Sequence, residues 1–148
     1  MKKLWYALVI GLVGSLAWSC SDDDYYNDFD LGYLPPDAQA FLSTFFYNDY
    51  VDDYWTEGYG ENLIYVVEFD SGLEVVFDYT GNWLEVDAPG NWAIPGGIAP
   101  AAIEWFIADN FPYCGINEIK RDYWGYEVEL TDGTDLMFDP NCNFIGYD

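Results

Sequence analysis

Carboxylates are by far the most numerous side chains in this sequence that could take part in catalysis or bind a metal ion. The chain has 27 Asp and Glu residues, four Lys and Arg residues and no histidine. The lack of histidine excludes Ser-His and Cys-His nucleophile pairs and a zinc–imidazole centre. Paired carboxylates could serve a glycoside hydrolase, but Glu127 and Glu129 share a face simply because alternate residues of a strand do, and such acids usually only solubilise. We therefore expect no enzymatic activity.

Oxygen-bearing side chains alternate in one short segment near the C-terminus. Asp139, Asn141 and Asn143 have the spacing of half a calcium loop, but the segment lacks the glycine and the distant bidentate glutamate of an EF-hand. The matching segment that begins at Asp78 reads as a plain hairpin turn. We interpret both segments as turns and keep these four residues as weak metal candidates. No cofactor is expected beyond calcium held weakly by the acidic surface.

The N-terminus has the features of an export signal. Lys2 and Lys3 precede an apolar run that is too short for a permanent membrane span and ends in Leu-Ala-Trp-Ser-Cys. This ending resembles a bacterial lipoprotein signal, so we predict a signal peptide at 1–19 and lipidation of Cys20. Residues 20–33 then form an acidic tether, and its initial Ser-Asp-Asp-Asp resembles the signal for display on the cell surface. We expect an outer membrane lipoprotein, at the cell surface or on the periplasmic face.

The charge of the mature chain restricts its partners. After Cys20 only two basic residues, Lys120 and Arg121, oppose 27 acidic ones, which gives a formal charge of −25. Nucleic acid is excluded, because phosphate binding needs clustered Lys and Arg. A cationic partner is favoured instead. The 7 Trp, 14 Tyr and 10 Phe residues indicate a folded domain rather than a disordered acidic chain.

Two pieces of sequence occur twice in the same order. Residues 68–87 align without a gap with residues 129–148, so that Gly72 matches Gly133. An upstream piece led by proline also recurs, which indicates a duplicated unit. We predict one domain at 34–148, made of repeats at 34–87 and 98–148 that are joined by a Pro- and Gly-rich linker at 88–97.

Each repeat should contain a helix followed by strands. Proline precedes apolar residues at helical spacing in both repeats. Tyr126, Val128 and Leu130 then alternate with acids, and Asp132-Gly133 signals a hairpin turn. The predicted fold class is α+β: a tandem repeat of a helix plus an antiparallel four-stranded meander, with the helices packed on one face of the sheet.

The two remaining cysteines invite a disulfide, since an exported chain with an even number of them often forms one. Cys114 should lie at the same end of the sheet as the turn at 132–133. Cys142 lies one strand further along, roughly 20 Å away for a six-residue strand. A disulfide needs Cα atoms within about 7 Å of each other, so we predict no bond.

The order of these pieces resembles a known family. A proline-led helix followed by the hairpin pattern YEVEL-DG-D-FD at 126–139, present twice behind a signal peptide, is similar to the PepSY-like family of beta-lactamase-inhibitor-like periplasmic proteins. The resemblance implies a helix-on-sheet α+β fold and no catalysis. By analogy with beta-lactamase inhibitor proteins, it also implies that the open face of the sheet binds a protein.

We therefore predict a non-enzymatic, membrane-anchored binding or inhibitor-like module whose partner is an unidentified protein or a cationic ligand. The alternative is a cell-envelope protein that binds or responds to calcium or another cation. The predicted contacts lie on the sheet face away from the helices and are acidic or apolar: Glu68, Glu74, Glu127, Glu129, Asp135, Val66, Val76 and Met137.

Overall fold

The computed structural model describes residues 31–148. The predicted signal peptide, Cys20 and all but the last three residues of the predicted tether lie outside the described residues. Within 31–148, no helix is long and apolar enough to cross a membrane.

The described chain contains a helix and four strands, then a second helix and four more strands. The helices are α1 (Pro36–Phe45) and α2 (Ala101–Asn110), and short 3-10 turns lie at Leu31–Tyr33 and Gly60–Asn62. The strands are β1 (Val51–Glu57), β2 (Ile64–Phe69), β3 (Glu74–Asp78), β4 (Trp83–Asp87), β5 (Ile116–Asp122), β6 (Gly125–Leu130), β7 (Asp135–Phe138) and β8 (Phe144–Tyr147). Both predicted helices are confirmed.

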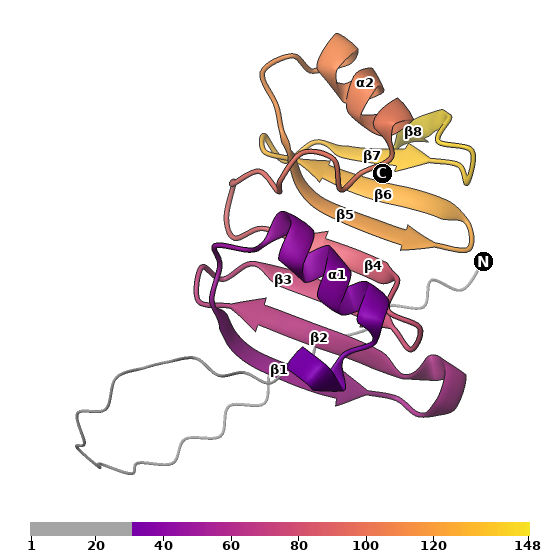
Figure 1. Ribbon diagram of the computed structural model, residues 1–148. Coiled ribbons are helices and arrows are strands. Elements are labelled where there is room, and N and C mark those ends of the chain that lie inside the picture. The colour runs from indigo at the N-terminus through magenta and orange to yellow at the C-terminus, as the bar shows by residue number, and fades with distance from the viewer. Residues whose placement is uncertain (1–30) are drawn as a thin grey trace, which may run out of the picture.

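All eight strands form one antiparallel sheet in chain order. The α+β class is therefore confirmed. Figure 1 shows both helices in front of the sheet, with α1 over strands of the first half and α2 over strands of the second half. We call this side of the sheet the helix face and the other side the open face. The two halves meet where β4 pairs with β5, through Glu85–Lys120, Val86–Ile119 and Asp87–Glu118.

The hydrophobic core lies between the helices and the sheet. Helix residues such as Leu42 and Ile107 belong to one buried cluster with the inward residues of the strands. An aromatic ring of each helix meets a strand phenylalanine edge-on: Phe41 contacts Phe77 at 5.6 Å and Phe106 contacts Phe138 at 5.4 Å between ring centres. These contacts fix each helix over its own four strands.

The segment between the halves is attached to the sheet by one buried polar side chain. Asn117 is 4% exposed, and its Nδ2 donates to the carbonyl oxygens of Ala88 (2.9 Å) and Trp92 (2.7 Å). Backbone hydrogen bonds from Ala88 N to Asn117 O and from Ile94 N to Ile116 O extend this attachment along β5. The segment therefore packs on the sheet instead of looping freely.

Candidate binding face

Strand register gathers carboxylates into one row on the open face. Residues paired across an antiparallel sheet point to the same side. The pairs Asp53–Glu68, Glu68–Glu74, Glu74–Asp87, Asp87–Glu118, Glu118–Glu129 and Glu129–Asp135 follow one another from β1 to β7. We call these residues the acidic row: Asp53, Glu68, Glu74, Asp87, Glu118, Glu129 and Asp135. Neighbouring members lie one strand spacing apart, about 4.8 Å.

A second row of mixed character runs beside the acidic row. It is formed by the paired residues Trp55, Val66, Val76, Glu85, Lys120, Glu127 and Met137. Its single cation, Lys120, lies 2.6 Å from an oxygen of Glu118 and 3.4 Å from an oxygen of Glu85. One ammonium group therefore bridges the two rows and the two halves of the sheet.

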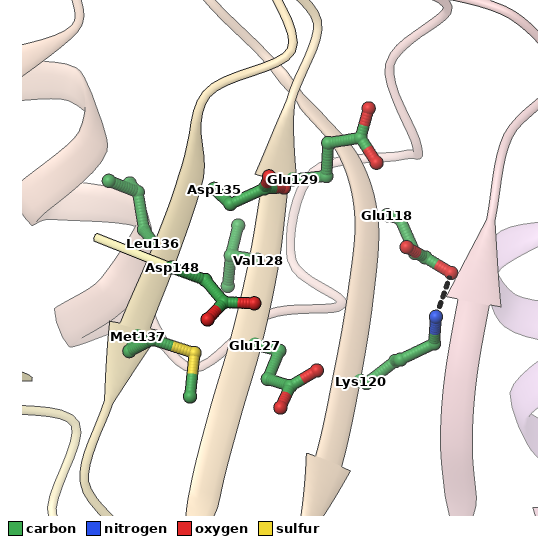
Figure 2. Close-up of a pocket in the computed structure, with 9 residues that line it drawn as sticks. All are labelled: Glu118, Lys120, Glu127, Val128, Glu129, Asp135, Leu136, Met137 and Asp148. Atoms are coloured by element: carbon green, nitrogen blue, oxygen red, sulfur yellow. Dashed lines mark ion pairs between the residues drawn. The ribbon is translucent and has the colours of Figure 1, made fainter. Parts of the chain in front are cut away.

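The two rows surround a hollow of about 50 Å³ at the C-terminal half of the open face. Figure 2 shows the residues that line it, which come from β5, β6, β7 and the last residue of the chain. They are Glu118, Lys120, Glu127, Val128, Glu129, Asp135, Leu136, Met137 and Asp148. Five carboxylates and one methionine around a small depression suit a cationic group with a short apolar stem.

Crowding and partial burial make several of these carboxylates hard to ionise. Burial, followed by the charges of Asp87 and Glu68, raises the pKa of Glu74. Burial, followed by the charge of Glu118, raises the pKa of Asp87. For Glu85, burial and a hydrogen bond with Glu118 raise the pKa to about 7, although Lys120 opposes the shift. The open face therefore still takes up protons near neutral pH.

The structure brings together most of the residues that the sequence predicted for this face. Glu68, Glu74, Glu129 and Asp135 lie in the acidic row, whereas Glu127 and Met137 lie in the second row. Four further residues of this face were not predicted, although their period-two spacing along β4 and β5 indicates a shared side of the sheet: Asp87, Glu118, Glu85 and Lys120.

Val66 and Val76 were predicted to be apolar contacts for a partner, but this prediction is wrong because both side chains are almost fully buried. They pair with each other on the open face but are only 4% and 8% exposed. Their register neighbours, Trp55 on β1 and Glu85 on β4, are larger and flank them on both sides. A partner can therefore touch very little of either valine.

Asp78 and Asp139 hold turns together with their carboxylate oxygens. Asp139 accepts hydrogen bonds from the backbone N–H groups of Asn141 and Asn143 and from the Asn143 side chain. Together these hydrogen bonds lower the pKa of Asp139, and the bond from the Asn143 side chain has the largest effect. At Asp78, burial opposes ionisation, but hydrogen bonds from Thr80 and Asn82 outweigh it and lower the pKa. The turn interpretation accounts for both carboxylates.

No group of three or more acidic or cysteine side chains with metal-binding geometry occurs in residues 31–148. The two thiols in this part of the chain are free. Cys114 contacts Asp132, in the turn before β7, whereas Cys142 lies beside Asp139, in the turn after β7. They therefore occupy opposite ends of that strand, as the sequence predicted.

With this geometry in hand, the chain can be compared with known proteins. Residues 64–146 match the family model described as "Putative beta-lactamase-inhibitor-like, PepSY-like". The chain belongs to the PepSY-like family. No curated protein sequence matches it significantly.

Three crystal structures resemble this PepSY-like protein. A putative calcium-regulated periplasmic protein from Bacteroides thetaiotaomicron is 36% identical with a TM-score of 0.74, and the match covers 80% of this chain and 92% of that one. A putative periplasmic protein from Bacteroides vulgatus is 34% identical with a TM-score of 0.75 and the same coverage. A second protein from B. vulgatus, of unknown function, is 27% identical with a TM-score of 0.74, covering 81% and 95%.

Proposed function

We propose that this PepSY-like protein is a non-enzymatic, membrane-anchored binding module that receives a cationic protein surface on the open face of its sheet. The acidic row is the observation that carries the proposal. Like charges directly opposite each other in a sheet are destabilising, and here seven carboxylates lie in consecutive register. This arrangement costs stability, and it gives the open face a negative potential that is complementary to a positively charged partner.

The rest of the fold supports the same proposal. Both helices lie on the other side of the sheet (Figure 1), and in residues 31–148 no helix covers the open face. The hollow between Glu127, Glu129, Asp135 and Met137 can take one cationic group of the partner that carries a short apolar stem.

We infer that the domain arose by duplication of a helix and four strands. The equivalent ring contacts Phe41–Phe77 and Phe106–Phe138 support this inference. The duplication doubles the width of the open face, because each unit supplies four strands to one continuous sheet.

Lipidation at Cys20 would anchor the module to the outer membrane, on the cell-surface or the periplasmic side. The description of the relatives as periplasmic supports an envelope location.

Charge-matched variants test the proposed face against general electrostatic attraction. The mature chain would be titrated with a decalysine peptide by calorimetry at two salt concentrations. Glu127→Gln combined with Glu129→Gln should weaken binding several-fold, because both charges border the hollow. The control, Asp37→Asn combined with Asp109→Asn, changes the net charge equally on exposed helix positions and should have little effect. Equal losses in both variants would contradict a specific role for the open face.

A cation-responsive protein is the second candidate function. The acidic row supports it, as does the relative described as calcium-regulated. Thermal melting of the mature chain with calcium, magnesium and sodium at matched ionic strength tests it. A rise specific to calcium at sub-millimolar concentration would indicate preferential binding to the folded state. A rise that follows ionic strength alone would indicate screening of self-repulsion and would remove this candidate.

A further inference from the structure

The two halves of the sheet are joined along the β4–β5 pairing, which we call the seam. Three residue pairs form it, compared with five between β2 and β3. One charged contact crosses it on each face of the sheet. On the open face Lys120 bridges to Glu85, and on the helix face the Arg121 guanidinium lies 4.7 Å from the centre of the Trp83 ring. Both basic residues that follow the signal peptide are therefore placed at the seam.

The open-face contact carries more negative charge than one lysine can offset. Lys120 contacts both Glu118 and Glu85, whose side chains are only 19% and 29% exposed. Asp87 pairs with Glu118, and Glu127 pairs with Lys120. The charged groups that face this contact from the neighbouring strands are otherwise all acidic: Glu74 on β3, Asp87 on β4, Glu127 and Glu129 on β6, Asp135 on β7, and the terminal Asp148.

Lys120 can offset only one of the two half-buried carboxylates that converge on it, and the acids around them favour holding a proton on the other. We propose that Glu85, Glu118 and Lys120 form a proton-dependent latch across the seam. One proton held between the two carboxylates keeps the halves of the sheet paired, and loss of that proton loosens the β4–β5 pairing. The Arg121–Trp83 contact on the helix face involves none of these three residues, so it remains as a hinge when the latch opens.

The protonation of Glu85 sets the direction in which pH changes the stability of the seam and the pH range of that change. Burial, followed by the hydrogen bond with Glu118, raises the pKa of Glu85 from 4.5 to about 7. A raised pKa means that the folded seam binds the proton more tightly than the open seam does. The stabilisation is therefore fully present below pH 4.5 and is lost as the pH rises through about 7.

The latch would also control the proposed binding face, because the acidic row crosses the seam at Asp87 and Glu118. A closed seam holds the two halves of the row in fixed register. An open seam lets them twist relative to each other. The latch itself does not depend on the identity of any partner, and its test needs none.

Amide hydrogen exchange in the mature chain tests the latch directly. Protection factors, corrected for intrinsic exchange rates, would be compared at pH 5.5 and pH 8 for amides of β4 and β5 and, as an internal reference, of β2 and β3. Proton linkage with the two pKa values above gives roughly a 30-fold rise in seam opening, which solvent screening reduces to about tenfold. We expect this loss of protection at the seam and not in the reference strands. Parallel loss in both would overturn the proposal.

Two further measurements make the result specific. Glu85→Gln should keep seam protection at pH 8 close to its value at pH 5.5, whereas the control Asp109→Asn, which removes the same charge from an exposed position on α2, should retain the pH dependence. Persistence of the full effect in Glu85→Gln would refute the latch. Carboxyl NMR titration of the unsubstituted chain gives an answer even if a variant fails to fold. Glu85 should titrate with a pKa of about 7, and an ordinary pKa for Glu85 would refute the held proton.

Discussion

Asn117→Ala should be among the most destabilising polar substitutions in this domain. The side chain is 4% exposed, and its Nδ2 is within 2.9 Å of Ala88 O and 2.7 Å of Trp92 O. Removing it breaks two hydrogen bonds, each worth about 1 kcal/mol net. It also leaves carbonyl groups without that donor in a region that water reaches poorly, which adds about 1–2 kcal/mol. We expect the free energy of unfolding to fall by about 2–4 kcal/mol.

Urea denaturation followed by tryptophan fluorescence measures this change. The control is Asn110→Ala, which removes a single exposed hydrogen bond to Phe106 O at 2.8 Å and should cost less than about 1 kcal/mol. Asn117→Asp should be at least as harmful as Asn117→Ala, since a carboxylate would face two carbonyl oxygens. If Asn117→Ala stays within about 0.5 kcal/mol of the unsubstituted chain, Asn117 does not anchor the segment between the halves.

Three further changes can be checked with the same denaturation assay. Because the pKa of Glu85 is raised to about 7, the free energy of unfolding should fall as the pH rises from 5.5 to 8.5. The full pKa shift corresponds to about 3 kcal/mol, which the partial exposure of the side chain reduces to about 1–2 kcal/mol. Glu85→Gln should make the free energy of unfolding nearly independent of pH over this range. Cys142→Gly should stabilise by about 0.5–1 kcal/mol, because Cys142 has φ 63° and the residue of the first half that aligns with it in sequence is Gly81; a loss of stability would contradict this. Arg121→Gln should lower the free energy of unfolding by about 0.5–1 kcal/mol, because it removes the cation–π contact with Trp83. If Arg121→Gln has no such effect in a chain that already carries Trp83→Leu, the contact between the two residues is confirmed.

The elements could be predicted from the sequence because their signals are local. Asp132-Gly133 indicates a hairpin through turn chemistry alone, and Gly133 indeed has φ 81°. Alternation at Val128 and Leu130 identifies the inward face, and both residues are buried. Proline followed by apolar residues at helical spacing locates α1 and α2.

The candidate binding face is harder to predict from the sequence, because it depends on strand register and on neighbouring side chains. Asp87 and Glu118 are far apart in the sequence, and only the β4–β5 pairing places them side by side. Val66 alternates as an exposed residue should, yet Trp55 across the pair leaves little of it accessible. Asn117 reads as an ordinary polar residue of a strand, since its partners lie in an irregular segment with no pattern of its own.

Photo-crosslinking in the native cell envelope tests directly whether the open face is the binding surface. A photoreactive phenylalanine analogue would replace Met137, in the second row of the open face, or Trp105, which is 72% exposed on α2. We expect a discrete crosslinked protein from position 137 that disappears when Glu127 and Glu129 are changed to Gln, and none from position 105. Crosslinks of equal yield from both positions, or from position 105 alone, would contradict it.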